Sequence, residues 1–136
     1  MITGLAHVCL AAGNLDDTQR FYCEGLGFTK TFDFIRDGKV VGFYLKVSDR
    51  TYVEVFLQDN IRPDGACPIR HFCLEVQDID AVANHLKANG YDITEKKLGA
   101  DHSWQAWTTD PTGVRIEFHQ YTDKSCQMTN QDCLLD

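Results

Sequence analysis

The stretch His7-Val8-Cys9-Leu10 decides the organisation of this chain, because it recurs 64 positions later as His71-Phe72-Cys73-Leu74. Later landmarks recur at a spacing of 63, which one residue fewer in the second copy explains; they are Gly27-Phe28 with Gly90-Tyr91, and Glu54 with Glu117. Internal repetition at this scale indicates one supersecondary unit that is used twice. We therefore expect two copies of the same order of strands and helices.

The first copy reads as a strand, a helix and three further strands. Asn14 is a typical helix N-cap, Asp16 and Asp17 suit the positive end of the helix dipole, and Gly27 ends the helix. Asp37-Gly38 is a good hairpin turn. The predicted elements are a strand at 3–11, a helix from 14 to about 26, and strands at 28–36, 39–47 and 51–58.

The second copy repeats this order after a linker at 59–69 that contains two prolines. The predicted elements are a strand at 70–77, a helix at 79–89 that Asp78 caps and Gly90 ends, and strands at 91–97, 103–109 and 114–121. The expected fold class is α+β: two tandem βαβββ modules, 3–58 and 70–121, whose curved mixed sheets enclose a metal cavity in a single domain of residues 1–121. The polar tail at 122–136 receives no predicted structure.

The composition argues against several classes of protein. The chain has 20 acidic and 13 basic residues and a net charge of −7, without the cationic footprint that nucleic acid requires. No apolar run approaches the roughly 20 residues of a membrane span, and the N-terminus lacks the basic start of a secretory signal. The six cysteines form no CxxC pair, so we expect free thiols in a cytoplasmic protein rather than disulfides.

Ionisable and apolar residues alternate along four of the predicted strands. Successive strand side chains point to opposite faces, so the apolar face packs under the helix and the ionisable face is left to line a cavity. The residues on the cavity faces include His7, Glu54, His71 and Glu117. Two imidazoles and two carboxylates suit a divalent ion such as Zn²⁺, Ni²⁺, Co²⁺ or Mn²⁺. A lone strand His or Glu is more often structural or solvated, but the repetition of both in each copy favours the metal site.

Several motifs together resemble the vicinal oxygen chelate superfamily, which includes glyoxalase I, extradiol dioxygenases and antibiotic resistance proteins. The likeness covers residues 3 to about 121 and rests on HVCL at 7–10, RFYCEGLGF at 20–28, YVEVF at 52–56, HFCLEV at 71–76 and DPTGVRIEF at 110–118. The ligand set His7, Glu54, His71 and Glu117 looks most like that of glyoxalase I, lactoylglutathione lyase. The resemblance implies one divalent ion (nickel, cobalt or zinc, with manganese or iron as further candidates) and a homodimer.

The resemblance also implies a reaction, in which a proton moves on an α-hydroxycarbonyl or hemithioacetal through a metal-bound enediolate. Glu117 would be the general base and Glu54 its counterpart. Bacterial glyoxalases carry an Arg and an Asn where this chain has Ala11 and Gln58, so the small-molecule substrate is expected to be another α-hydroxycarbonyl or a sugar-derived metabolite. The expected substrate contacts are Gln58, Arg115, His119 and Trp104, although core packing is the usual role of tryptophans such as Trp104 and Trp107.

Two other functions use the same cavity. A metal-free binding protein would sequester a small aromatic or cationic compound, and the two tryptophans and the acidic residues would suit it. An Fe(II) extradiol-type dioxygenase would use His7, His71 and Glu117 as ligands, and Glu54 would then be incidental. The retained His and Glu pairs favour the metal-dependent lyase or isomerase.

Overall fold

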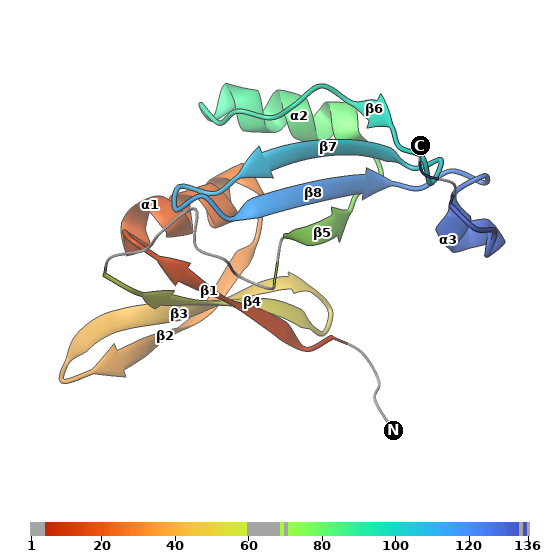
Figure 1. Ribbon diagram of the computed structural model, residues 1–136. Coiled ribbons are helices and arrows are strands. Elements are labelled where there is room, and N and C mark those ends of the chain that lie inside the picture. The colour runs from red at the N-terminus through yellow and green to blue at the C-terminus, as the bar shows by residue number, and fades with distance from the viewer. Residues whose placement is uncertain (1–4, 60–68, 70, 134, 136) are drawn as a thin grey trace. The chain divides into compact units, whose positions relative to one another are not determined.

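The computed structural model describes residues 5–59, 69, 71–133 and 135 (Figure 1). The chain divides into two compact units: the first contains residues 1–65 and the turn at 110–114, and the second contains 66–109 and 115–136. Most of the predicted linker, together with the first two residues of the predicted strand at 3–11, lies outside the described residues.

The first unit is a βαβββ module, as predicted. Its four strands form one sheet in the order β1-β4-β3-β2, in which β1 is parallel to β4 and the other neighbours are antiparallel. The elements are β1 (His7–Ala12), α1 (Leu15–Arg20), the π-helical turn η1 (Phe21–Gly25), β2 (Thr29–Arg36), β3 (Lys39–Ser48) and β4 (Thr51–Leu57).

Local signals place the boundaries of these elements. The side chain of Asn14 accepts a hydrogen bond from the Asp17 amide at 3.0 Å, so it caps α1 as expected. The helical segment continues without a break through η1 and ends before Gly27, whose φ of 73° is a conformation that favours glycine. The turn between β2 and β3 places Asp37 at φ 51° and Gly38 at φ 73°, as a tight hairpin requires.

The second unit repeats the module. Its sheet has the order β5-β8-β7-β6, again with a parallel first pair, and α2 contacts β7 and β8 (Figure 1). The elements are β5 (Phe72–Glu75), α2 (Ile79–Ala88), β6 (Lys97–Leu98), β7 (Trp104–Thr109), β8 (Arg115–Gln120) and the short helix α3 (Cys126–Thr129). The predicted fold of two βαβββ modules with mixed sheets is therefore confirmed.

The predicted strand at 91–97 is wrong, because only Lys97–Leu98 forms a strand there. The amide of Thr94 donates to the carbonyl of Trp107 at 2.8 Å, as in a ladder. The return bond, however, runs from the Trp107 amide to the Thr94 hydroxyl at 2.9 Å, and the Thr108 hydroxyl donates to the Asp92 carbonyl. Side-chain hydroxyls thus replace backbone partners, which holds the segment beside β7 without a regular ladder.

The apolar strand faces form the core of each unit, as the alternation predicts. In the first unit Phe43, Leu45, Val53 and Val55 are buried with Phe21 and Tyr22 of the helical segment. In the second unit the buried residues are Ile79 and Leu86 of α2 and Ala106, Ile116 and Phe118 of the sheet. None of the described helices is long and apolar enough to cross a membrane.

The turn between β7 and β8 is built around one buried carboxylate. Asp110 accepts hydrogen bonds from the amides of Thr112 at 2.9 Å and Val114 at 2.8 Å. Its other oxygen accepts a bond from the Tyr22 hydroxyl at 3.0 Å. Burial raises the pKa of Asp110, and these hydrogen bonds partly offset that effect. The first residue of the DPTG sequence is therefore a structural residue of the first unit.

Candidate functional site

The repeated His and Glu residues occupy the same place in both sheets. Cys9 of β1 pairs with Glu54 of β4, and Cys73 of β5 pairs with Glu117 of β8. The equivalence extends to the next strand, where Tyr44 lies opposite Glu54 and Trp107 lies opposite Glu117. Each unit therefore presents a His, a Glu and a large aromatic side chain on one face of its sheet, in one register.

In the first unit, His7 and Glu54 form an open pair. His7 Nε2 lies 3.9 Å from Glu54 Oε2, and the side chains are 41% and 20% exposed. The Tyr44 hydroxyl lies 3.2 Å from His7 Nδ1, so this contact orients the imidazole with Nε2 toward the carboxylate. An imidazole nitrogen and a carboxylate oxygen that face each other are donors that a borderline divalent ion accepts.

In the second unit, Glu117 lies between two imidazoles. His71 Nε2 is 3.2 Å from Glu117 Oε2, and His119 Nε2 is 2.9 Å from Glu117 Oε1. Trp107 packs edge-on against His71, with ring centroids 4.8 Å apart. The Glu117 side chain is only 10% exposed, so this carboxylate is more enclosed and better partnered than Glu54. The two repeats are therefore not chemically equivalent.

Polar residues lie on the Nδ1 side of the His119 ring, opposite the side that faces Glu117. Its Nδ1 atom lies 4.0 Å from Asp101 Oδ2, which also accepts a bond from the Gln127 side chain at 2.7 Å. The Ser103 amide donates to the other oxygen of Asp101 at 3.1 Å. Burial raises the pKa of Asp101, but the hydrogen bonds from Gln127 and Ser103 and the nearby His119 outweigh it, so the pKa lies below its usual value. Asp101 is therefore an anion beside His119, at 4.0 Å, which is an electrostatic contact longer than a hydrogen bond.

The four predicted substrate contacts differ in their exposure and in the residues that they contact. Arg115 lies over the Trp107 ring at 4.5 Å, close to Glu117 on the same strand. His119 binds Glu117 directly instead of standing apart from it. Trp104 is partly exposed beneath Lys96 at 5.2 Å, so it is not a core residue. Gln58 is exposed just beyond β4.

Some residues of the site were not predicted from the sequence. Tyr44 could have been found, because it precedes Glu54 by the same ten positions that separate Trp107 from Glu117. No local pattern marks Asp101 or Gln127, whose relation to His119 depends on how α3 and the loop before β7 pack together.

The open face of the first sheet carries stacked aromatic rings. Tyr44 stacks on Phe32 at 4.9 Å and on Tyr52 at 5.1 Å, while Phe34 stacks on Phe56 at 4.5 Å. Gly42 lies between Phe34 and Phe56 in the pairing, and a Cβ there would collide with the Val55 carbonyl oxygen and lie 2.9 Å from the Phe56 ring. A side chain at this position would therefore disturb both the backbone of β4 and the rings. Phe32 is 48% exposed, so this aromatic face is available to a flat apolar group.

The two repeated cysteines lie on the same faces as the ligand candidates, as the strand alternation predicts. Burial, followed by a hydrogen bond and charge from Glu54, raises the pKa of Cys9 to about 11. Burial and the charge of Glu117 raise the pKa of Cys73 to about 12. Both thiols thus lie beside a glutamate, and these raised pKa values disfavour thiol reactivity at neutral pH.

We expect iodoacetamide to alkylate Cys9 at pH 7 roughly 100-fold more slowly than a thiol of pKa 9.0, because a pKa of about 11 lowers the thiolate fraction by that factor. Peptide mass spectrometry would follow this one residue, which is exposed, so access does not limit the rate. The Glu54→Gln variant should react faster because the carboxylate no longer raises the pKa. Equal rates for Cys9 and a free thiol would contradict the prediction.

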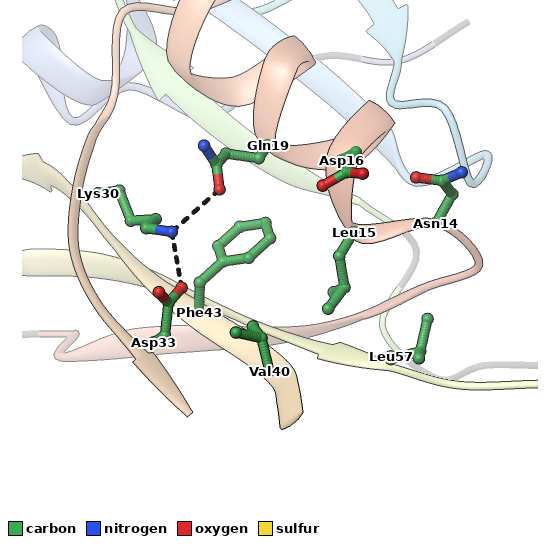
Figure 2. A pocket seen from close by; sticks show the side chains of 9 residues that line it. All are labelled: Asn14, Leu15, Asp16, Gln19, Lys30, Asp33, Val40, Phe43 and Leu57. Carbon is green, nitrogen blue, oxygen red and sulfur yellow. Dashed lines mark hydrogen bonds and ion pairs between the residues drawn. The ribbon is translucent and has the colours of Figure 1, made fainter. Parts of the chain in front are cut away.

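A separate hollow of about 350 Å³ lies on the other face of the first sheet, between α1 and the strands. Figure 2 shows Lys30 between Gln19 and Asp33. Its Nζ atom lies 3.2 Å from Gln19 Oε1 and 2.7 Å from Asp33 Oδ1. Phe43 and Leu57 line this hollow, and they alternate with the residues of the Glu54 face. It is therefore not part of the His and Glu site.

Comparison with known proteins identifies the family. Residues 4–118 match the model of the Glyoxalase/Bleomycin resistance protein/Dioxygenase superfamily. The chain belongs to this superfamily, whose fold is the pair of βαβββ modules described above. The resemblance drawn from the HVCL, HFCLEV and DPTGVRIEF motifs is confirmed.

Solved structures with the same fold include proteins of different functions. A glyoxalase family protein from Enterococcus faecalis is 25% identical, with a TM-score of 0.74 over 85% of this chain and 96% of that one. TnmS3, an antibiotic binding protein from Streptomyces sp. CB03234, is 20% identical, with a TM-score of 0.71 over 89% of this chain and 98% of that one. Lactoylglutathione lyase from Agrobacterium tumefaciens is 19% identical, with a TM-score of 0.65 over 87% of this chain and 93% of that one. The same fold therefore occurs in a lyase and in an antibiotic binding protein.

Proposed function

We propose that this protein is a metal-dependent lyase or isomerase of the glyoxalase I type, which moves a proton on an α-hydroxycarbonyl or hemithioacetal. The observation that carries the proposal is the repeated register, in which Cys9 pairs with Glu54 and Cys73 with Glu117, each beside a His. A protein that only binds an organic molecule has no need of two such pairs. The likeness of the fold to lactoylglutathione lyase from Agrobacterium tumefaciens supports the proposal.

The proposed ligands of the metal are His7, Glu54, His71 and Glu117, which together would hold one divalent ion per chain. Their nitrogen and oxygen donors suit nickel, cobalt or zinc, and also manganese or iron. The proposal treats residues 1–121 as one functional domain and requires the two pairs to meet, either within one chain or between the chains of a homodimer. The homodimer and the cytoplasmic location stay predictions.

The residues of the second unit suit proton transfer. A divalent ion bound by the four residues would act as a Lewis acid toward the vicinal oxygens of the substrate. Glu117, with one His on each oxygen, would accept the C–H proton, and Glu54 would serve the opposite side. Arg115, Gln58 and His119 would offer polar contacts to the substrate, and Trp104 would offer a partly exposed ring.

The test is proton exchange on candidate substrates, with the metal content measured on the same preparation. The purified protein, loaded in turn with Ni²⁺, Co²⁺ and Zn²⁺, should incorporate solvent deuterium at the C–H carbon of a genuine α-hydroxycarbonyl or hemithioacetal. About one ion per chain by mass spectrometry should accompany that activity. Deuterium incorporation that is equal with and without metal would contradict the proposal, and iron with ring-cleaving activity would favour the dioxygenase.

The aromatic face of the first unit favours a second candidate function, in which the protein sequesters an aromatic compound without metal. Phe32, Tyr44 and Tyr52 form a continuous stack that a flat molecule could extend. TnmS3 shows that an antibiotic binding protein has this fold. Tight binding of an aromatic ligand to protein stripped of metal, unchanged in a Glu117→Gln variant but weakened in Tyr44→Ala, would establish this function instead.

A further inference from the structure

The second unit contains a group of three different metal donors on two adjacent strands. Single ligand atoms of Cys73, Glu117 and His119 all lie within 4.8 Å of one another. We propose that these three residues form a metal site that takes a thiophilic divalent ion, such as Zn²⁺ or Cd²⁺, without any ligand from the first unit. This site shares only Glu117 with the ligand set of the proposed function and does not rest on it.

The strand pairing brings the donors together. Cys73 is the direct partner of Glu117 across β5 and β8, and His119 lies two residues further along β8 on the same face. Zinc bonds to sulfur, nitrogen and oxygen are about 2.0–2.3 Å long, so two ligand atoms of one tetrahedral ion are roughly 3.3–3.7 Å apart. The donors therefore need to approach one another by up to about 1 Å, and the exposed Cys73 side chain has room to move.

The two oxygens of Glu117 separate this site from His71. Oε1 faces His119 at 2.9 Å, whereas Oε2 faces His71 at 3.2 Å. An ion on the Oε1 side would thus take His119 and Cys73 as its remaining protein ligands, with the fourth position open to water. Three protein ligands with one open position are a common zinc arrangement.

The residues behind His119 fit the role of outer support for a metal ligand. With Nε2 directed at Glu117, the Nδ1 atom is directed at Asp101, which Gln127 and Ser103 hold in place. A carboxylate behind a ligating histidine sets the orientation of the ring and raises its basicity. Through its bond to Asp101, Gln127 of α3 would be part of this outer support.

The first unit provides a matched control for this site. Cys9 and Glu54 correspond to Cys73 and Glu117 in the repeat, but the residue that corresponds to His119 is Phe56. Among the described residues, Cys73, Glu117 and His119 are the one group of three potential metal donors whose ligand atoms lie within 4.8 Å of one another. A thiophilic ion should therefore bind at the second unit and not at the first.

The test uses Co²⁺, because a thiolate ligand adds a near-ultraviolet charge-transfer band that oxygen and nitrogen ligands do not produce. The full-length protein should show this band on titration with CoCl₂. Cys73→Ser should abolish it, and His119→Phe should weaken Co²⁺ binding by roughly 10-fold or more. The controls Cys9→Ser and His7→Ala should keep the band, and Cys9→Ser, which belongs to neither proposed ligand set, should bind Co²⁺ within about 2-fold of the wild type.

Several outcomes would overturn the site: no band in the wild type, a band that survives in Cys73→Ser, or a band lost in His7→Ala. Circular dichroism would check that each variant folds. If His119→Phe does not fold, His119→Gln would be used in its place to test the loss of the imidazole ligand. The readout is independent of turnover. A charge-transfer band without proton exchange would support this metal site and contradict the proposed reaction. Proton exchange without the band would support the reaction and contradict the metal site.

Discussion

Glu117→Gln is expected to lower turnover by roughly 10²–10⁴, the usual cost of losing a general base. The carboxamide keeps the size of the side chain and can still accept a hydrogen bond from one of its two histidine neighbours. It does not accept a proton at neutral pH, however. Stability should change much less, by about 1–2 kcal/mol, because one of the two His contacts at 3.2 and 2.9 Å loses its acceptor. Steady-state kinetics and chemical denaturation would measure the two effects separately.

Glu54→Gln is the matched control for that variant. Glu54 has the same place in the repeat, but it is twice as exposed as Glu117 and its His neighbour is 3.9 Å away. Its loss should therefore reduce turnover less if Glu117 is the base. Solvent-deuterium exchange at the substrate carbon reports the proton transfer directly. Wild-type exchange in Glu117→Gln, together with its loss in Glu54→Gln, would assign the base to Glu54.

His7→Ala and His71→Ala should each weaken the binding of Ni²⁺ by roughly 10²–10³. Four ligands that share a binding free energy of about 10–16 kcal/mol contribute about 2.5–4 kcal/mol each, which corresponds to that change in Kd. Calorimetric titration in a Cys73→Ser background would remove any contribution from the thiol. A single shared ion requires that both substitutions, 64 residues apart, weaken the binding of Ni²⁺.

His85→Ala is the control for both histidine variants, because His85 is exposed on α2 and belongs to neither pair. It should leave the Kd for Ni²⁺ unchanged. If His7→Ala binds Ni²⁺ as tightly as the wild type while His71→Ala does not, the ion belongs to the second unit alone and the four-residue ligand set is wrong.

Much of the fold could be predicted because the repeat and the strand alternation are local properties of the chain. Side chains that alternate along a strand have only two faces to occupy, so the burial of Val53 and Val55 leaves Glu54 on the open face. The cap at Asn14 and the turn at Asp37 likewise depend on neighbouring residues only. The strand at 91–97 was predicted wrongly because two of its bonds to β7 run through side chains: the Thr94 hydroxyl accepts from the Trp107 amide, and the Thr108 hydroxyl donates to the Asp92 carbonyl. Hydropathy does not distinguish such hydroxyl bonds from a backbone ladder.

By itself the sequence determined which residues could act as ligands and on which face of each sheet they lie. It did so because the period of a strand and the spacing of the repeat are readable from residue order alone. Only the tertiary structure decided that Glu117 lies between two imidazoles, that Cys73 and His119 stand beside it, and that Asp101 and Gln127 support His119. These contacts join β5, β8, α3 and the loop before β7, and the distance between side chains on separate elements depends on packing that no local pattern records.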